Sequence, residues 1–405
     1  MSLIVQKYGG SSVADVDKLK KIASMIAIAK KQGIDVVVVV SAMGKTTNQL
    51  IEMAKSISSD PPGREIDMLL STGERTSMAL LCIALYEEGI DAISLTGSQA
   101  GIITNDRHND ARVIEVRPIR VLDEIDKGKV VVIGGFQGVS YKRDITTLGR
   151  GGSDTSAVAL AAALNADRCE IYSNVDGVYT TDPNIVKEAK HLPEISYQQI
   201  QEMAEAGAKV LNAQAVQFAK ESKIALYARA AFNPGKETII KDVSKSELSG
   251  VLAVVYEKEI VRIYVHDVDK VDWVLQYLEE NQIPIKEFQV SGIAGDRGYK
   301  CSFIISTNNL YNWEKIKEIL QEKLRDGVYI NESLGTLSII GEGFSRNNDA
   351  LIRTLLLLKR NGIIYYGVNT TSFRISVLVE KYLLEEAVKI CHEYWITKDE
   401  IKQQV

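Results

Sequence analysis

The sequence predicts an α/β domain with a largely parallel sheet, followed by two small α+β modules. Over the first 230 residues, short β-branched runs alternate with longer helical patterns, as in a parallel sheet covered by helices. The valine run Asp35–Val40 has the continuous apolar character of a strand buried on both faces. Beyond about residue 250 a strand–helix–strand pattern occurs twice. A chain of 405 residues has room for two or three domains of roughly 150 residues each.

The first domain is expected to alternate strands and helices along the chain. β-branched runs predict strands at Ser2–Val5, Asp35–Val40, Val130–Ile133 and Cys169–Ser173. Apolar residues at helical spacing predict helices at Asp17–Lys31, Thr46–Ile57, Glu65–Glu88 and Thr155–Ala166. A polar stretch rich in Lys, Glu and Ser, Lys241–Ser249, is expected to connect this domain to the next.

The two modules repeat one pattern. The first is expected to contain strands Val261–Val265, Ile283–Val290 and Cys301–Ser306, and helices Val268–Glu280 and Tyr311–Leu324. The second is expected to contain strands Leu337–Ile340, Ile363–Val368 and Phe373–Val379, and helices Asp349–Arg360 and Leu383–Trp395. Both carry Leu-x-x-Asn-x-Ile at the turn from the first helix to the next strand, starting at Leu278 and Leu358. This indicates a duplicated, ferredoxin-like βαββαβ module, although small α+β folds also resemble one another by chance.

Composition argues against several classes of protein. The net charge of -5 and pI of 5.7 argue against a nucleic-acid partner held by bulk electrostatics. The four cysteines form no C-x-x-C pair and the four histidines show no metal-ligand spacing, so no protein-bound metal is expected. The absence of a signal-peptide pattern, of an apolar run of about 18 residues and of paired cysteines predicts a cytoplasmic protein without a membrane span.

A first candidate phosphate site follows the N-terminal strand, at Lys7-Tyr8-Gly9-Gly10-Ser11-Ser12. Glycines let backbone N–H groups approach a phosphate, and the start of the next helix favours an anion. Lys7 would add a point charge. Because the lysine precedes the glycines, the segment differs from a G-x-x-x-x-G-K-[ST] loop. A plain strand-to-helix turn with an exposed lysine is the alternative.

Two further segments could hold a small polar substrate. Ser41–Asn48 follows the valine strand, and ligands of open parallel sheets bind outside the carboxyl ends of strands. Its hydroxyl residues could equally be helix N-caps. Ser71–Arg75 interrupts a helical pattern with Gly73, which costs a helix about 1 kcal/mol relative to alanine. Glu74 could pair with a substrate ammonium or belong to a solvated charge pair.

The strongest local signal is the glycine-rich loop Leu148–Thr155, which contains Arg150 and opens a helix. The planar guanidinium of arginine suits a carboxylate bidentately. Asp154 falls in the first turn of that helix, where the helix dipole favours a carboxylate. Ser153 or Asp154 could be mere caps, but the glycines together with Arg150 favour a binding function.

Two later segments are weaker signals by themselves. Tyr172–Pro183 combines a strand end with Asp-Gly and Asp-Pro, which are ordinary turn signals. Gly207–Leu211 contains a second candidate lysine, Lys209, although a single lysine on a helix is usually solvated.

Together and in this order, the segments resemble those of the amino acid kinase family, and specifically its aspartate kinases. The matching stretches span most of residues 1–230: KYGGSS, SAMGKTTN, STGERTS, TLGRGGSDTSAVALAAALNAD, EIYSNVDGVYTTDP and GAKVL. The C-terminal modules, including NTTSFRISVLVE, resemble the family's paired ACT domains. The resemblance implies an amino acid kinase fold at residues 1–240 and ACT modules at 251–332 and 333–405. It also implies phosphorylation of the L-aspartate side chain by ATP carried with Mg²⁺, the first step of lysine, threonine and methionine biosynthesis.

By this resemblance each site residue has an expected role. The catalytic residues would be Lys7, Asp154 and Lys209, with Asp154 orienting the lysines. The transferring phosphate and the nucleotide would be bound by Lys7, Gly9, Gly10, Ser11, Ser173, Asn174, Tyr179, Asn184, Lys209 and Val210. Aspartate would be bound by Ser41, Thr47, Glu74, Arg150 and Ser153, with Arg150 on the α-carboxylate and Glu74 near the α-ammonium.

The implied chemistry is physically consistent. The aspartate side chain has a pKa of about 3.9, so it is ionised at neutral pH and can act as a nucleophile without a general base. Catalysis then rests on positioning and on charge stabilisation. Three residues depart from the family pattern: Asn174 stands where Asp is usual, Asn184 where Arg is common and Asn212 where His is common. Nucleotide affinity is therefore harder to infer than the reaction.

Two other functions stay open. A sister kinase that acts on glutamate or acetylglutamate would share the glycine loops, but the paired modules and Ser71–Glu74 favour aspartate. A catalytically inactive amino-acid sensor would not need Lys7, Arg150, Asp154 and Lys209.

The resemblance also implies feedback inhibition and a homodimer or homotetramer formed through the ACT modules. The effector would contact His266, Asp267, Val268, Asp269 and Val271, together with Asn369 and Thr370 of the second module or of a partner chain. Asp267 and Asp269 could hold an ammonium group, which favours lysine over threonine. A helix N-cap at Asp269 and a solvated Asp267 are the ordinary alternatives.

Overall fold

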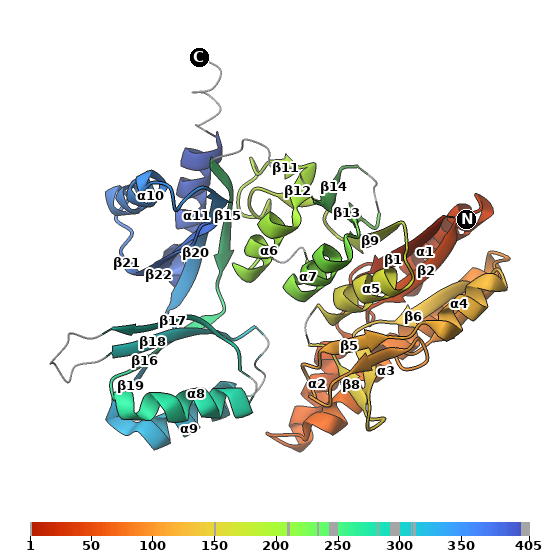
Figure 1. The fold of residues 1–405 in the computed structure, drawn as a ribbon, viewed down its shortest axis with the longest axis horizontal. Helices are drawn as coiled ribbons and strands as arrows, with labels where there is room; N and C mark the ends of the chain where they lie inside the picture. Colours follow the sequence, from red (N-terminus) through yellow and green to blue (C-terminus); the bar gives the residue numbers. More distant parts are fainter. Residues whose placement is uncertain are drawn as a thin grey trace, which may run out of the picture. The chain divides into compact units, whose positions relative to one another are not determined.

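The chain divides into two units in the computed structural model, shown as a ribbon in Figure 1. The structure describes residues 2–149, 151–208, 211–232, 235–242, 250–281, 283–291, 300–308, 310 and 313–397. Unit 1 comprises Met1–Tyr179, His191–Glu205 and Lys209–Ser246, and unit 2 comprises Thr180–Lys190, Ala206–Ala208 and Glu247–Val405.

An eight-stranded sheet forms the centre of unit 1, in the order β12-β14-β13-β9-β1-β2-β6-β3. In chain order these strands are β1 (Leu3–Tyr8), β2 (Asp35–Val40), β3 (Ala92–Leu95), β6 (Val130–Gly134), β9 (Arg168–Ser173), β12 (Glu194–Ser196), β13 (Leu226–Ala230) and β14 (Glu237–Lys241). All neighbours run parallel except β13 and β14. The predicted, largely parallel sheet is confirmed.

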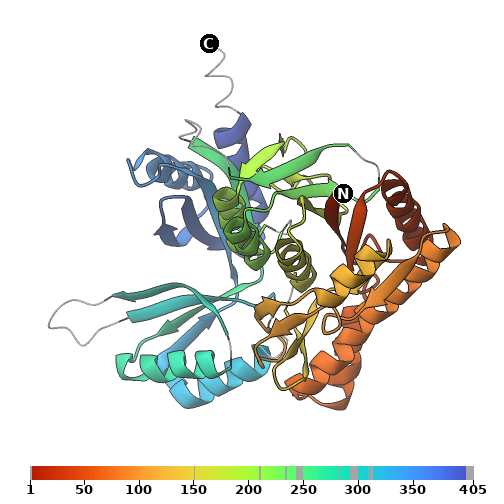
Figure 2. The same cartoon turned by 45° about the vertical axis from the view of Figure 1, so that its right-hand side comes forward.

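Helices cover both faces of this sheet. Helix α1 (Val16–Lys31) and helix α3 (Gly63–Glu87), red and orange in Figure 2, lie side by side and pack apolar side chains against alternate residues of β1, β2 and β6. Helix α5 (Gly152–Ala163), whose small residues are almost all buried, contacts β1, β2 and β9. The remaining helices of unit 1 are α2 (Thr46–Ile57), α4 (Ile119–Asp126), α6 (Tyr197–Glu205) and α7 (Ala213–Ser222).

Helix α3 is the one helix of the described chain that is long and apolar enough to cross a membrane by length and composition. Half of its most apolar window is buried. Leu81 and Leu85 lie in the core beside α1, and the same helix buries Asp67 and Glu74. These contacts are those of a core helix in the α/β unit.

Short strands complete unit 1. A smaller sheet has the order β5-β4-β7-β8 and contains β4 (Ile102–Thr104), β5 (Val113–Val116), β7 (Gln137–Ser140) and β8 (Ile145–Thr147). Strands β10 (Val178–Tyr179) and β11 (His191–Leu192) form a separate antiparallel pair.

The first module of unit 2 has the predicted βαββαβ order, which confirms the ferredoxin-like arrangement. Its sheet order is β17-β18-β16-β19. The elements are β16 (Ile260–Val265), α8 (Val271–Glu280), β17 (Ile285–Ser291), β18 (Lys300–Ser306), α9 (Trp313–Leu324) and β19 (Val328–Asn331). Two 3₁₀ turns, η1 (Val268–Lys270) and η2 (Arg325–Gly327), precede α8 and follow α9.

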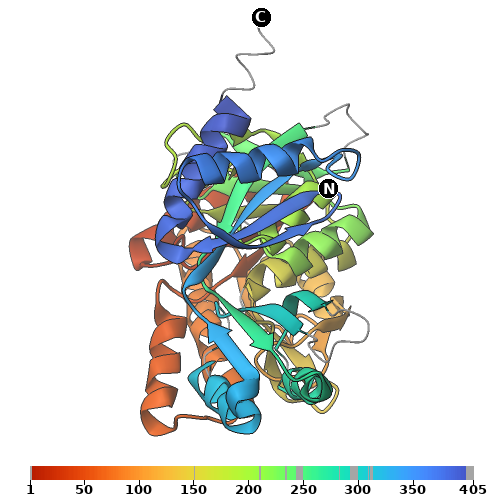
Figure 3. The same ribbon diagram turned by 90° about the vertical axis from the view of Figure 1, so that its left-hand side faces the viewer.

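The second module has the sheet order β15-β20-β22-β21. Its elements are β15 (Gly250–Glu257), β20 (Leu334–Glu342), α10 (Asp349–Arg360), β21 (Tyr365–Thr370), β22 (Arg374–Glu380) and α11 (Leu384–His392). A 3₁₀ turn, η3 (Lys381–Leu383), precedes α11 and a π-helical turn, η4 (Glu393–Thr397), follows it. Figure 3 shows this module with α10 and α11 beside each other.

The chain is partitioned differently from the predicted ranges in two places. Strand β15 lies, except for its first residue Gly250, within 251–332, the range predicted for the first module, but it pairs with β20 in the second sheet. In the described chain no strand follows α11, so β15 supplies the fourth strand of that sheet. Residues Thr180–Lys190 fall within the predicted catalytic range 1–240 but belong to unit 2.

Candidate functional site

The predicted site segments follow the carboxyl ends of neighbouring strands in the central sheet. Tyr8 at the end of β1 pairs with Val40 of β2 and with Tyr172 of β9, and Val40 pairs with Gly134 of β6. These four strands are parallel, so their carboxyl ends lie together. The loops that follow them therefore meet at one place.

Lys7 and Asp154 form an ion pair at this edge. The distance from Lys7 Nζ to Asp154 Oδ1 is 2.5 Å, and the two side chains are 12% and 9% exposed. Lys7 belongs to the end of β1, and Asp154 lies in the first turn of α5, after Gly151 with its positive φ of 72°. In so little solvent the attraction between the charges is stronger than in water. Asp154 thereby fixes the position of the lysine charge.

The loop after β1 packs closely on the loop after β2. A Cβ atom on Gly10 would lie 2.9 Å from the carbonyl oxygen of Ala42, so the approach requires glycine. A Cβ atom on Gly9 would lie 3.5 Å from Lys7 Nζ. Of the two serines that follow, Ser11 is exposed, whereas Ser12 is buried with no partner for its hydroxyl among the described residues.

Glu74 is the buried carboxylate of the site. Its Oε1 atom accepts a hydrogen bond from the backbone N–H of Ala42 at 3.0 Å, while Oε2 is buried with no partner in the described part of the chain. Burial raises the pKa of Glu74 to about 7. A Cβ atom on Gly73 would lie 2.8 Å from the Cβ of Ala42, so this glycine allows α3 to approach the loop. The unused oxygen suits a cationic group of a ligand.

The turn Gly134–Phe136, which ends β6, was missed by the sequence analysis. A Cβ atom on Gly135 would lie 2.9 Å from the Cβ of Ser153, and one on Gly134 would lie 3.4 Å from the Cβ of Glu74. Phe136 has a φ of 67°, which is rare for a residue other than glycine. The turn therefore runs between two predicted aspartate-binding residues. Two glycines directly after a buried strand were the available signal.

Three of the predicted nucleotide residues lie at the end of β9, directly after it, and on β10. The Ser173 hydroxyl closes a turn by accepting from the N–H of Val175 at 3.1 Å, and Asn174 is exposed. The Tyr179 hydroxyl donates to Asp176 Oδ1 at 2.7 Å, and its ring meets the His191 ring edge-on at a centroid distance of 5.4 Å. Burial and the bond to Asp176 raise the pKa of Tyr179 to about 12. The tyrosine ring is thus held on two sides.

Asn212, one of the departures from the family pattern, supports the glycine-rich loop. Its Oδ1 accepts from the N–H of Gln214 at 2.8 Å and so caps α7. A Cβ atom on Gly151 would lie 2.7 Å from Asn212 Nδ2. The Asn212 side chain thus packs closely against Gly151, the residue that precedes α5.

The remaining predicted residues are placed as follows. Ser41 and Thr47 are partly buried, at the end of β2 and in the first turn of α2, and Ser153 is buried in α5. Asn184 lies in unit 2, where its Nδ2 donates to Asp182 Oδ1 at 2.9 Å. Three predicted residues lie outside the described residues: Arg150, Lys209 and Val210. Within the described ranges, no cluster of His, Cys, Asp or Glu could hold a metal ion.

Five of the seven predicted effector residues lie at the turn between β16 and α8. Asp267 Oδ1 accepts from the N–H of Asp269 at 3.2 Å, and Asp267 Oδ2 lies 3.7 Å from Lys270 Nζ. His266 is exposed and Val271 is buried at the start of α8. Val268 opens the 3₁₀ turn, and Asn369 and Thr370 end β21 of the other sheet.

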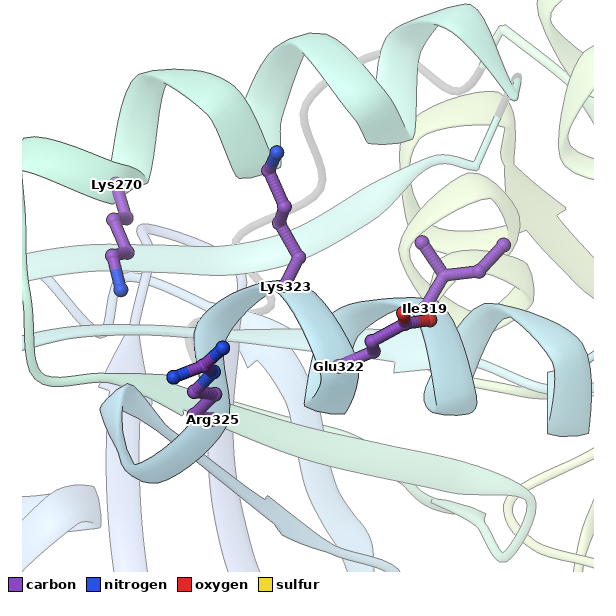
Figure 4. A pocket seen from close by; sticks show the side chains of 5 residues that line it. All are labelled: Lys270, Ile319, Glu322, Lys323 and Arg325. Carbon is purple, nitrogen blue, oxygen red and sulfur yellow. The ribbon is translucent and has the colours of Figure 1, made fainter.

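A pocket lies beside this turn in the first module (Figure 4). It is lined by Lys270, Ile319, Glu322, Lys323 and Arg325. Cationic side chains predominate in this lining, which suits a carboxylate group. A ligand with both charges would thus find acidic and basic groups close together.

Comparison with known proteins identifies relatives of the whole chain. Residues 2–228 match the Amino acid kinase family. The aspartokinase of Bacillus sp. (strain MGA3) is 40% identical and that of Geobacillus stearothermophilus 39% identical, each over 97% of this chain and 97% of the relative. Aspartokinase 2 of Bacillus subtilis (strain 168) is 38% identical with the same coverage. The similarity therefore extends over both units.

Solved structures share the fold. E. coli aspartokinase III in complex with aspartate and ADP (R-state) matches with a TM-score of 0.83 at 23% identity, covering 97% of this chain and 99% of that one. The same enzyme in complex with lysine and aspartate (T-state) matches with a TM-score of 0.72 at 22% identity and the same coverage. Aspartate kinase from Synechocystis is 33% identical, with a TM-score of 0.55, and the match covers 97% of this chain and 69% of that chain.

Proposed function

Since this chain belongs to the amino acid kinase family and, within it, to the aspartokinases, we propose that the strand-end site transfers the γ-phosphoryl group of ATP to the side-chain carboxylate of L-aspartate. The observation that carries this proposal is the Lys7–Asp154 ion pair, which lies beside the glycine loop after β1. A fixed positive charge at such a loop suits a phosphoryl group in transfer.

Glu74 would select the amino acid. Its Oε2 is buried and has no partner among the described residues, and it would accept a hydrogen bond from the α-ammonium group of aspartate. The resulting ion pair would replace the lost solvation shell. Ser41, Thr47 and Ser153 would contribute hydroxyl groups around the substrate, and Arg150 would bind the α-carboxylate. These contacts would leave the side-chain carboxylate directed at the phosphate.

Lys7 would stabilise the transferring phosphoryl group together with the backbone N–H groups of Gly9 and Gly10. Asp154 holds the ammonium of Lys7, so little reorganisation is required when charge develops on the phosphoryl oxygens. Lys209 would add a second positive charge. The nucleotide would be contacted by Ser11, Ser173, Asn174, Tyr179, Asn184 and Val210. Mg²⁺ carried by the nucleotide would neutralise phosphate charge. Because the acceptor is already an anion, no residue needs to remove a proton.

Feedback control is the second part of the proposal. The solved E. coli enzyme that shares this fold has been obtained in complex with lysine and aspartate (T-state). In this chain, Asp267 and Asp269 offer carboxylates for an ammonium group, while the pocket beside them offers cations for an α-carboxylate. This pairing favours lysine over threonine as the effector. Inhibition would require that lysine bind two states of the enzyme with different affinities.

We also propose a cytoplasmic homodimer or homotetramer formed through the ACT modules. Strands β17 and β21 are sheet edges. Both carry exposed large apolar side chains, among them Phe288, Val290, Tyr365 and Tyr366. Edge strands of this kind are suited to pairing with another chain.

ADP release from the purified chain tests the substrate assignment. We expect ADP to form with ATP, Mg²⁺ and L-aspartate, and only at background rate with L-glutamate or N-acetylglutamate. A faster rate with either of the latter acids would identify a sister kinase. No acceptor-dependent ADP, together with lysine binding by calorimetry, would identify an inactive sensor.

A further inference from the structure

Residues Thr180–Lys190 form a strap that belongs to unit 2, although the residues on either side of it, Tyr179 and His191, belong to unit 1. The chain leaves unit 1 after Tyr179 of β10 and returns at His191 of β11, and these two residues pair with one another. We propose that His392, at the end of α11, is a positioning residue for the nucleotide site, because it holds the strap and thereby Tyr179. This inference rests on the proposed function, in which Tyr179 contacts the nucleotide.

Thr180 is the residue of the strap next to Tyr179, and all its polar groups are bonded. It is 4% exposed. Its carbonyl oxygen accepts from the N–H of Val254 in β15 at 2.8 Å, and its hydroxyl lies 2.8 Å from Nε2 of His392. The hydroxyl also accepts from the N–H of Lys190 at 2.9 Å, and the Thr180 N–H donates to the Lys190 carbonyl at 2.9 Å. Two elements of unit 2 therefore fix the backbone at this point.

The rest of the strap is anchored in the same module. Val186 belongs to the apolar core formed with Leu384, Val388 and Cys391 of α11. The Tyr256 hydroxyl lies 3.1 Å from Asp182 Oδ2, to which it donates. The strap thus takes part in the core of the second module, which offsets the entropy lost in ordering it.

His392 has an environment that suits a fixed, neutral hydrogen-bonding partner. Its side chain is fully buried, and Nδ1 has no partner among the described residues. Burial and the nearby Lys190 lower the pKa of His392. Because the Thr180 hydroxyl already accepts from the Lys190 amide, its own proton can be donated to Nε2. Losing this bond would leave the proton of the Thr180 hydroxyl, or the buried imidazole, without a partner among the described residues.

The consequence for catalysis follows from chain continuity. Tyr179 directly precedes Thr180, and its ring is set against Asp176 and His191. A shift of Thr180 would therefore change the backbone that carries the tyrosine ring. An effector that moves α11 would reach the nucleotide side of the reaction by the same route, with no need to touch the aspartate side.

The test measures the KM for ATP and the KM for aspartate separately in full-length variants. We expect His392→Leu to raise the KM for ATP about fivefold, the usual effect of one hydrogen bond, with the KM for aspartate unchanged. Thr180→Val also removes the bond from the Lys190 N–H, so it should raise the KM for ATP at least as much. His392→Gln, which retains a hydrogen-bonding group, should restore most of the affinity. The double variant His392→Leu/Thr180→Val should have the same KM for ATP as Thr180→Val alone, because both variants lack the bond between the two side chains.

Trp395→Phe is the control for a loss of packing in the core that the strap shares. Trp395 is buried in the same apolar cluster as Val186, but its indole N–H donates to Thr354 and not to the strap. It should keep the parent KM for ATP despite a comparable loss of stability. If His392→Leu fails to fold, the KM for ATP of the nearly isosteric Thr180→Val variant tests the inference. A folded Thr180→Val or His392→Leu with the parent KM for ATP would overturn the inference. A parent chain with no aspartate-dependent ADP formation would instead overturn the proposed function.

Discussion

Glu74 accepts a hydrogen bond from the backbone N–H of Ala42 at 3.0 Å, and its second carboxylate oxygen is buried without a partner in the described structure. A carboxylate held in this way is costly to the folded protein unless a cation joins it. If Glu74 binds the substrate ammonium as proposed, the same carboxylate affects both the stability of unit 1 and its affinity for aspartate.

Glu74→Gln is therefore expected to weaken substrate binding and to stabilise the free protein. The pKa of Glu74 in the folded chain, about 7, exceeds the ordinary value of 4.5. Folding thus favours the protonated form, and the cost of the charge is absent below pH 4.5 and fully present above pH 7. Above pH 7 the variant should gain up to about 3 kcal/mol in free energy of unfolding, and the gain should vanish as pH falls to about 4.5. The KM for aspartate should rise at least about tenfold.

Urea unfolding at several pH values and initial-rate kinetics check both effects. Glu65→Gln, an exposed glutamate of the same helix, is the control and should change neither quantity. A variant at Glu74 that binds aspartate normally would remove this residue from the substrate site.

Gly73→Ala is expected to be harmful although alanine is the better helix former. In a typical helix the change stabilises by about 1 kcal/mol. Here the new methyl group would lie 2.8 Å from the Cβ of Ala42, so α3 and the loop after β2 must move apart. We expect a lower melting temperature and a raised KM for aspartate. Thermal unfolding beside Thr72→Ala, an exposed neighbour, checks this, and an increase in stability would show that the contact is not tight.

Lys7→Ala is expected to lower kcat by about 10²–10³-fold while leaving the fold intact. The variant removes one preorganised charge at the transferring phosphate, which is typically worth roughly 3–4 kcal/mol. Lys20→Ala, an exposed lysine of α1, should retain the parent kcat. Single-turnover kinetics with circular dichroism as a check on folding decide the matter. A folded variant with near-parent kcat would exclude Lys7 from catalysis.

Asp267→Ala is expected to raise the lysine concentration needed for half-inhibition about tenfold, which corresponds to about 1.4 kcal/mol. The uninhibited kcat should not change, because the residue lies in the first module of unit 2. Asp272→Ala, in the first turn of α8 and exposed, is the control. Inhibition curves that coincide with the parent's would place the effector elsewhere, and a parent insensitive to lysine would reject lysine itself.

Long, regular elements could be predicted from the sequence and short or non-local ones could not. β2, α2 and α10 match their predicted bounds because uninterrupted valines or apolar residues at helical spacing mark them. β4 and β8 have too few residues to show a period. The pairing of β15 with β20 could not be predicted, because the whole first module lies between the two strands in the sequence.

The candidate site was predictable in its parts but not in its contacts. Lys7 was expected near phosphate from its glycine segment, and Asp154 was expected in the first turn of a helix, with its role beside the lysines implied only by the family resemblance. Their ion pair depends on the packing of α5 on β1. Gly73 was interpreted as a cost to a helix, whereas the structure shows it as a condition for the bond between Glu74 and Ala42. The Asp-Gly and Asp-Pro dipeptides predicted turns around the strap Thr180–Lys190. They gave no indication that the strap packs in unit 2.

The most direct test of the central claim is to identify the product. The purified chain would be incubated with ATP, Mg²⁺ and L-aspartate in the presence of hydroxylamine, which displaces phosphate from an acyl phosphate to give a hydroxamate. We predict aspartate β-hydroxamate, formed in equal amount to ADP and abolished by Lys7→Ala. ADP formation without a hydroxamate, or a hydroxamate at the α-carboxylate, would contradict phosphorylation of the aspartate side chain at this site.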